Sequence, residues 1–203
     1  MENPCGSSSL PYWKMAETVM PENMLILHSS NFSPEYLTKY TDEPYFRLYH
    51  DLQNIYTAVL PDGYCLCEAA PSEYAEHINQ CYANMSMSVA EIESYFEHSV
   101  YSADLWIAVR DRKNQKIAAT GIAEFDNQVS EGILEWIQVS PTYRGIGLGK
   151  YTVTELLKRI AEKAKFATVS GQVNNVYKPE NLYRKCGFKG NDVWHILRPS
   201  INS

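Results

Sequence analysis

The pattern of hydrophobic and polar positions is regular only after about residue 60. From Tyr64 onward, short apolar runs alternate with amphipathic stretches, and polar or glycine- and proline-containing turns separate them. This alternation predicts strands at 64–69, 105–110, 116–125, 132–139, 166–173 and 193–197, the last preceded by Phe188. It predicts helices at 72–84, from Ser88 onward, at 147–165 and at 179–186.

Local signals support the predicted helices. Ser72 is placed to cap the first one, and Ser88 with Glu91 has the spacing of a capping box. The long helix has a buried face at helical spacing, formed by Val153, Leu156, Leu157, Ile160 and Ala164. The last helix has Pro179 at its start and Gly187 just after its end.

The order of these elements is β-α-α-β-β-β-α-β-α-β, which predicts an α/β domain with a mixed central β-sheet flanked by helices over residues 61–203. Residues 1–60 are rich in Pro, Ser and Tyr, and only Met24–His28 is typical of a strand. Asp42-Glu43-Pro44 has the composition of a turn or a helix start. We therefore interpret residues 1–60 as an N-terminal extension that packs on the main domain.

Composition narrows the classes of function. The 203 residues are 45% hydrophobic and carry a net charge of -6, which argues against nucleic acid or an anionic membrane as the main partner. No apolar run approaches the length of a membrane span, and no secretory signal is visible. The five cysteines are scattered and show no disulfide or metal-site spacing. These features predict a cytoplasmic protein without a metal.

A glycine-containing loop between the apolar strand 132–139 and the long helix is the most informative segment. Gly145, Gly147 and Gly149 alternate there, and a helix start after such a loop offers free N–H groups and a favourable dipole to an anion. The spacing fits neither a dinucleotide fingerprint, because the third glycine falls one residue early, nor a Walker A loop, because Tyr151 follows Lys150. The loop therefore predicts a phosphate cradle of another kind.

Two motifs together resemble those of the GNAT superfamily of acetyl-CoA-dependent N-acetyltransferases. The first is the pyrophosphate loop R-x-x-G-x-G/A, present as Arg144-Gly145-Ile146-Gly147-Leu148-Gly149. The second is an Asn before LY-x-K-x-GF, present as Asn174-Asn175 followed by Leu182-Tyr183-Arg184-Lys185-Cys186-Gly187-Phe188. The resemblance covers about two thirds of the chain, from Tyr64 to the end, and leaves out residues 1–60. It implies the GNAT fold for residues 61–203.

The resemblance also implies which residues bind acetyl-CoA, the expected co-substrate. The end of the central strand offers backbone groups to the pantetheine, the loop amides hold the pyrophosphate with Arg144 beside it, and the second motif adds further contacts. The residues concerned are Ile137, Gln138, Val139, Arg144, Gly145, Ile146, Gly147, Leu148, Gly149, Lys150, Asn174, Asn175, Tyr183 and Lys185. The spacing from Asn175 to Leu182 is slightly longer than is usual in the family.

Acetyl transfer to an amine needs a group that removes a proton from the amine and one that protonates the leaving thiolate. The resemblance implies Tyr183 as the general acid. Glu135 is the candidate base, because strand alternation predicts that it shares a face with Val139. Glu131 has the same parity and is an alternative, as is a water molecule.

The function expected is therefore direct transfer of an acetyl group from acetyl-CoA to a primary amine in a ternary complex. Two alternatives stay open, a CoA-binding module without catalysis that serves sensing or protein contact, and an acyltransferase that uses another acyl-CoA. The sequence does not identify the amine, which is a small molecule or a peptide, and it leaves the oligomeric state open.

Overall fold

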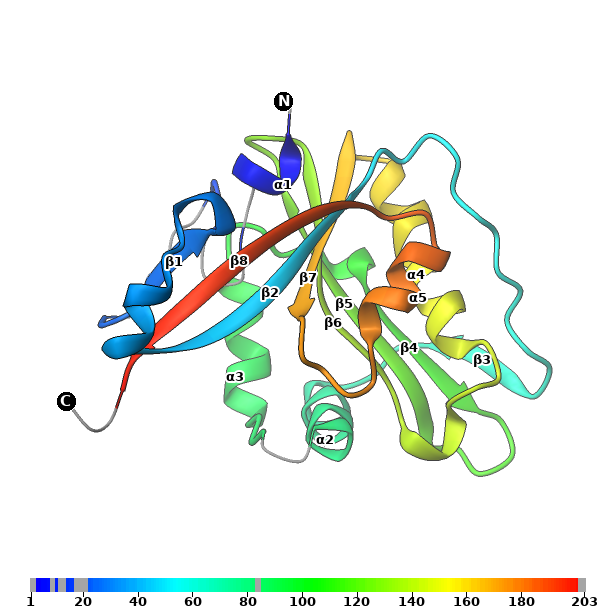
Figure 1. Cartoon of the computed structure of the whole chain (residues 1–203). Helices are drawn as coiled ribbons and strands as arrows, with labels where there is room; N and C mark the ends of the chain where they lie inside the picture. The colour runs from blue at the N-terminus through cyan, green and yellow to red at the C-terminus, as the bar shows by residue number, and fades with distance from the viewer. Residues whose placement is uncertain (1–2, 8–9, 11–13, 17–21, 83–84, 201–203) are drawn as a thin grey trace.

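A computed structural model describes residues 3–7, 10, 14–16, 22–82 and 85–200 and shows one eight-stranded sheet (Figure 1). The spatial order of its strands is β1-β8-β2-β7-β6-β5-β4-β3, and only β6 and β7 pair in parallel. The strands are β1 (Leu25–His28), β2 (Tyr40–His50), β3 (Tyr64–Cys67), β4 (Trp106–Asp111), β5 (Ile117–Asp126), β6 (Glu131–Val139), β7 (Phe166–Gln172) and β8 (Lys189–Pro199). The mixed sheet expected from the sequence is confirmed.

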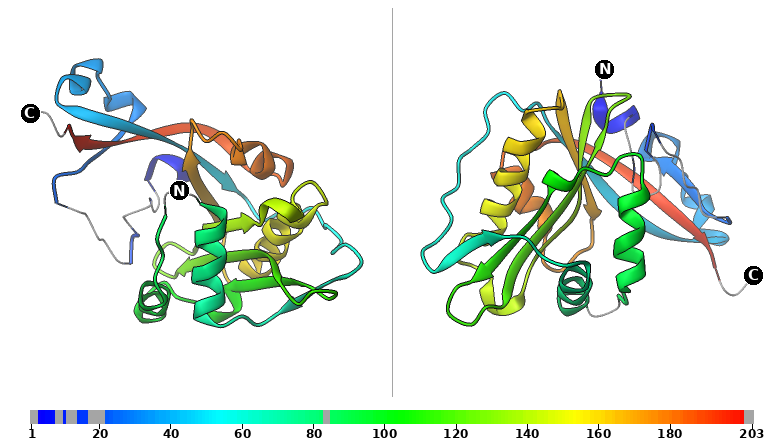
Figure 2. Two further views of the ribbon diagram at one scale, coloured as in Figure 1. Left: turned by 90° about the horizontal axis from the view of Figure 1, so that it is seen from below. Right: turned by 180° about the vertical axis from the view of Figure 1, so that it is seen from behind.

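Helices cover both faces of this sheet (Figure 2). One face carries α2 (Pro71–Cys81) and α3 (Val89–Ser94), and the other carries α4 (Leu148–Ala161) and α5 (Pro179–Lys185). The remaining helical segments are α1 (Pro4–Ser7) and 3-10 turns at Ser29–Asn31, Pro34–Thr38, Tyr95–Glu97, Ala103–Leu105 and Pro141–Tyr143.

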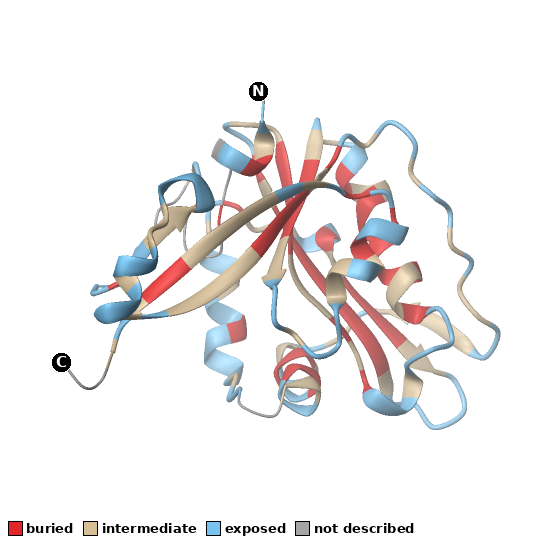
Figure 3. Cartoon of the chain, in the orientation of Figure 1, coloured by how far each residue is buried: buried red, intermediate tan, exposed pale blue. Residues whose placement is uncertain are grey.

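The largest core cluster lies between the sheet and α4, where the buried segments concentrate (Figure 3). The predicted stripe of α4 faces this core, with Val153, Leu156, Leu157 and Ile160 fully buried. Gly121 of β5 lets the helix approach closely, because a Cβ atom there would lie 2.7 Å from Thr152 Cγ2. The stripe therefore fixes α4, and with it the loop that precedes the helix, against the middle of the sheet.

The N-cap predicted for α3 is confirmed, whereas the N-cap predicted for α2 is wrong. Ser88 accepts from the Glu91 N–H at 3.2 Å and Glu91 accepts from the Ser88 N–H at 2.7 Å, so the predicted capping box is present. The cap predicted at Ser72 is wrong, because α2 begins at Pro71 with Ala70 as its N-cap. A proline is well suited to the first helical position, since its missing N–H would have no partner there.

The N-terminal region contributes a strand that the sequence pattern did not indicate. Strand β2 runs through the turn expected at Asp42–Pro44 and lies between β8 and β7, well inside the sheet. Pro44 fits because it lies just outside the last β2–β7 pair, Tyr45 with Gln172. The division of the chain at residue 60 stays a prediction, but β2 shows that both parts share one sheet.

Candidate functional site

The two parallel strands at the centre of the sheet separate halfway along their length. Strand β6 pairs with β7 only from Glu131 with Phe166 to Leu134 with Val169, although β6 continues to Val139 and β7 to Gln172. From Glu135 onward, the edge of β6 that faces β7 therefore has no strand paired with it. Backbone N–H and C=O groups along such an edge are available to a bound molecule.

A β-bulge lies at the point where the strands separate. Ile122 pairs with Trp136 and Ala123 pairs with Leu134, so Glu135 is an extra residue in β6. Bulges occur often beside active sites, where they redirect a side chain. The bulge directs Glu135 to the face that carries α2 and α3, where its carboxylate contacts the Lys14 ammonium.

The prediction that Glu135 and Val139 share a face is wrong for this reason. Val139 packs with Leu148 and Tyr151 of α4, on the opposite face of the sheet. The extra residue at the bulge shifts the alternation of side chains by one position, so residues before and after it no longer share parity.

The glycine loop lies at the end of β6 and leads directly into α4. Gly145 and Gly147 have φ angles of +84° and +95°, a conformation that residues with a Cβ atom rarely adopt. Gly147 is the N-cap of α4, and no side chain caps this helix start. The first N–H groups of α4 are therefore not used by a cap and are available to an anion.

Gly149 positions the loop against the neighbouring helix. A Cβ atom at Gly149 would lie 3.2 Å from Leu182 of α5 and 3.5 Å from Val139 of β6. The start of α4, the end of β6 and α5 therefore meet at one place. Leu148 is fully buried in the core there, whereas the side chain of Ile146 is 45% exposed.

Two cations lie beside the loop. Arg144 donates from Nε to the Val139 carbonyl at 3.0 Å, and its guanidinium lies 4.2 Å from the centre of the Tyr177 ring. Lys150 lies in the first turn of α4, with its ammonium 3.5 Å from the centre of the Tyr56 ring. Both cations are therefore held near the uncapped helix start, where they add to its attraction for an anion.

Tyr183 lies on α5 and is 6% exposed, with its ring packed beside Phe46 and Phe188. Burial raises the pKa of its hydroxyl far above the usual value of 10, and the nearby Tyr82 hydroxyl raises it further. Tyr82 follows α2, on the other face of the sheet. The two tyrosines therefore come near each other from opposite faces of the sheet.

The other predicted contact residues have different surroundings. Ile137 packs against the core on the α4 side, and Gln138 is buried with its amide donating to Thr120 Oγ1 at 2.6 Å. Asn175 accepts from the Tyr177 N–H at 2.9 Å and so shapes the loop before α5. Asn174 lies in the loop before α5 and Lys185 is the last residue of α5, and both are exposed.

Glu131, the alternative base, lies at the other end of β6 from the glycine loop. Its carboxylate is fully buried, 3.0 Å from the Arg47 guanidinium, and it accepts a hydrogen bond from the Thr168 hydroxyl. Because Arg47 and Thr168 already hold it in the core, Glu131 has no open path to a substrate among the described residues.

Comparison with known proteins shows which family one segment of the chain resembles. Residues 102–190 match the model of the acetyltransferase (GNAT) domain. This segment, less than half of the chain, is similar to a GNAT acetyltransferase domain. No curated protein sequence matches the chain.

Solved structures share the fold of this GNAT domain at low sequence identity. A GCN5-related N-acetyltransferase from Sphaerobacter thermophilus superposes with a TM-score of 0.70 at 15% identity, over 89% of this chain and 61% of the other. A GNAT-family acetyltransferase from Colwellia psychrerythraea gives 0.60 at 15% identity, over 85% and 64%. The ribosomal-protein-S18-alanine N-acetyltransferase from Escherichia coli gives 0.51 at 16%, over 69% and 98%. The chain thus spans about three fifths of the length of the first two.

The GNAT domain match contains the bulge, the glycine loop and α5, but it begins after β2, α2 and Lys14. No helix in the part of the chain that the structure describes combines the length and apolar character that a membrane crossing requires.

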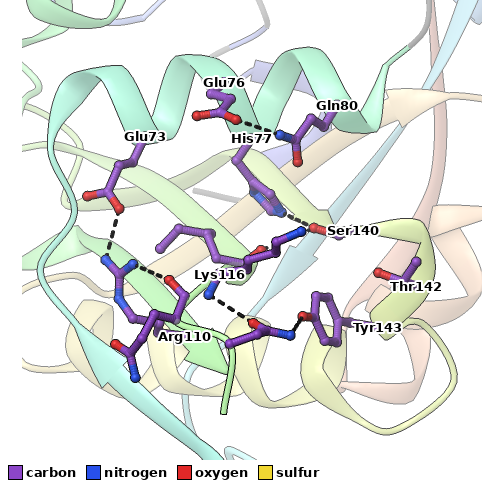
Figure 4. A pocket seen from close by; sticks show the side chains of 12 residues that line it. Glu73, Glu76, His77, Gln80, Arg110, Lys116, Ser140, Thr142 and Tyr143 are labelled. Atoms are coloured by element: carbon purple, nitrogen blue, oxygen red, sulfur yellow. Dashed lines mark hydrogen bonds and ion pairs between the residues drawn. The ribbon is translucent and has the colours of Figure 1, made fainter. Parts of the chain in front are cut away.

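A polar cavity of about 620 Å³ lies beside the glycine loop of the GNAT domain, on the α2 side of the sheet (Figure 4). The cavity wall carries positive and negative side chains, including Glu73 and Arg110, which form an ion pair at 2.9 Å. Thr142 and Tyr143, just before the glycine loop, also line the cavity. His77 lies at its base, with Nε2 2.8 Å from Ser140 Oγ and Nδ1 2.9 Å from Thr120 Oγ1. His77, Thr120 and Ser140 are far apart in the sequence, and the fold alone brings these groups together.

His77 is expected to make the stability of the protein depend on pH. Burial lowers its pKa from the ordinary value of 6.5 to about 4, so the folded protein keeps the ring neutral. Between these values the unfolded chain binds a proton that the folded chain does not. Stability is therefore complete above pH 6.5 and falls as the pH drops toward 4, by up to about 3 kcal/mol.

The variant His77→Gln tests this expectation, because glutamine retains a hydrogen-bonding amide but does not titrate. Urea denaturation measured across this pH range is expected to give a flatter pH dependence for the variant than for the natural chain. Parallel curves for the two proteins would contradict the role of His77.

Proposed function

We propose that the chain transfers an acetyl group from acetyl-CoA to a primary amine by direct transfer in a ternary complex. One observation carries the proposal, namely the separation of β6 and β7 at Glu135 beside the uncapped glycine loop. A strand edge for an extended chain and a helix start for an anion then lie next to each other, as a molecule with a pyrophosphate and a long flexible arm requires.

The residues present fit such a molecule. The loop is open at Gly145 and Gly147, where a Cβ atom would meet nothing within 4 Å, and Arg144 and Lys150 lie beside it. We assign the pyrophosphate to the amides of residues 145–150. The strand edge at 137–139 is assigned to the pantetheine. We assign Asn174, Asn175 and Lys185 to the rim of the acetyl-CoA site.

The chemistry divides between the two faces of the sheet. Acetyl-CoA supplies the acetyl group as a thioester. Glu135 removes a proton from the acceptor amine, because its carboxylate lies where the strands separate and already holds an ammonium group. Tyr183 protonates the leaving thiolate, since its raised pKa keeps the hydroxyl protonated at neutral pH.

The first test is calorimetric titration of the purified protein with acetyl-CoA, with NAD and ATP as controls. We expect saturable binding of acetyl-CoA alone, followed by thiol release when amines are added. Binding without thiol release for any amine would favour a CoA-binding module without catalysis. Preference for a longer acyl-CoA would favour another acyl donor, and no binding would overturn the proposal.

Gly147→Ala is expected to weaken acetyl-CoA binding by about tenfold or more. An alanine at this φ costs about 1 to 2 kcal/mol, and relief of that strain would move the loop amides away from the anion. Gly63→Ala is the matched control, because Gly63 has a φ of +85° with open space around it but lies in the turn before β3. Both variants should lose similar stability, and only Gly147→Ala should lose affinity in calorimetry. Equal affinities would contradict the role of the loop.

A further inference from the structure

A lysine from the N-terminal region occupies the place beside the candidate base. The Lys14 ammonium contacts the Glu135 carboxylate and lies 3.3 Å from Glu124 Oε2, and only 11% of its side chain is exposed. No local pattern connects Lys14 with Glu135, which lies 121 positions later.

The described part of the segment around Lys14 is anchored on both sides of this lysine. Leu10 is fully buried, and the Ala16 N–H donates to Asp126 Oδ2 at the end of β5, at 2.8 Å. A long flexible lysine buried at this depth is unusual unless its charge is paired. The anchors and the two carboxylates together hold the amine at the point where β6 and β7 separate.

We propose that Lys14 is a self-acetylation site, whose ε-amine occupies the position of the acceptor amine in its own chain. The inference rests on the proposed function and deepens it, because it names one amine that the site accepts. A buried amine held against the base has the proximity and orientation that favour transfer within one molecule.

The charges around Lys14 determine how the step runs. Burial alone would lower the pKa of this amine, but Glu135 and Glu124 outweigh burial and raise it, so the resting group is an ammonium. One proton passes from this ammonium to Glu135. The nitrogen then forms a bond to the carbonyl carbon of the acetyl thioester, the C–S bond breaks, and the thiolate leaves as a thiol with the proton of Tyr183. The second proton of the nitrogen passes to the Tyr183 oxygen as the amide forms, so Tyr183 ends protonated.

Acetylation would change the site that holds the segment. An acetylated lysine carries no charge, so Glu124 and Glu135 would face each other on the α2 and α3 side without their shared cation. Two largely buried carboxylates without a cation repel each other, which favours release of the segment. The acetylated chain is therefore expected to acetylate an external amine faster than the unmodified chain.

The test incubates the full chain with acetyl-CoA and follows acetylation by intact-protein mass spectrometry and peptide mapping. We expect Lys14 to react about tenfold or more faster than Lys113, an exposed lysine in the β4–β5 turn, with a rate constant independent of protein concentration. Lys14→Arg should abolish this rapid acetylation, and the matched control Lys113→Arg should leave it unchanged.

Two carboxylate variants separate base catalysis from simple ion pairing. Glu135→Gln is expected to slow acetylation of Lys14 by about 100-fold or more, and Glu124→Gln by much less, although each removes one carboxylate next to the amine. Equal effects of the two variants would contradict the assignment of Glu135 as the proton acceptor for Lys14.

Other results would overturn the inference or the function beneath it. Acetylation of an external amine with Lys14 reacting no faster than Lys113 would overturn the inference alone. A rate for Lys14 that rises with protein concentration would also overturn it, because the amine would then come from a second molecule. Absence of acetyl-CoA binding would overturn both the inference and the proposed function.

Discussion

Replacing Arg47 with leucine is expected to lower the free energy of unfolding by about 3 to 5 kcal/mol. The Arg47 side chain is 1% exposed and lies 3.0 Å from the carboxylate of Glu131, which is fully buried. It also donates to Thr168 Oγ1 at 2.9 Å and to Ser170 Oγ at 2.8 Å. Without the guanidinium, the core would retain a buried carboxylate without its cation, which is the costly result of breaking such a pair.

Thermal unfolding checks this expectation, with a decrease in Tm of roughly 10 °C for a chain of this size. Arg198→Leu is the matched control, because Arg198 also pairs with a glutamate of β2, Glu43, at 3.6 Å, but both side chains are about 40% exposed. The control should change stability by less than about 1 kcal/mol. The double variant Arg47→Leu with Glu131→Leu should recover much of the loss. Equal effects of Arg47→Leu and Arg198→Leu would show that the buried pair is not central to the fold.

The elements that the sequence predicted well are those whose signals are local. The apolar stripe of α4 recurs every three or four residues and can face only one core. The capping box of α3 and the glycines before α4 act within a single turn of backbone. Because the glycine loop and the motif of α5 are also short and contiguous, a candidate acetyl-CoA site could be proposed from sequence alone, and its residues stay a prediction.

Strand β2 was missed because its strand character depends on distant partners. Its sequence contains Pro44 and polar residues at 41–43, which are typical of a turn when taken alone. In the fold, β8 and β7 pair with β2 on both sides and bury Arg47, a residue type that is nearly always exposed unless it is paired. Only the carboxylate of Glu131, 84 positions later, makes this arginine suitable for a core.

The immediate surroundings of Glu135 were unpredictable for a related reason. Simple alternation along β6 assumes a regular strand, whereas the bulge arises from the pairing of β6 with β5. The contact with Lys14 joins two segments that no local pattern connects. The candidate base could thus be named from its position in a strand, but neither its direction nor its neighbours could be.

Tyr183→Phe is expected to reduce the turnover of acetyl transfer by about 100-fold or more, the usual contribution of a positioned general acid. The substitution removes only the hydroxyl and leaves the ring packed beside Phe46 and Phe188, so the fold and acetyl-CoA affinity should persist. Tyr74→Phe is the matched control. Tyr74 is similarly buried, but it lies on α2 and packs against Trp106, on the other face of the sheet from Tyr183. Steady-state kinetics and calorimetry on the two variants separate a lost proton donor from lost packing.

The dependence of turnover on pH gives this prediction its sharpest form. Because burial raises the pKa of Tyr183 above its usual value of 10, the hydroxyl stays protonated throughout the neutral and moderately alkaline range. If the proposed function holds, the unmodified chain should therefore keep its rate of acetyl transfer as the pH rises toward 10, and the loss in Tyr183→Phe should be constant over that range. A loss that disappears at neutral pH, or a Tyr183→Phe variant as active as Tyr74→Phe, would show that the leaving thiolate obtains its proton elsewhere.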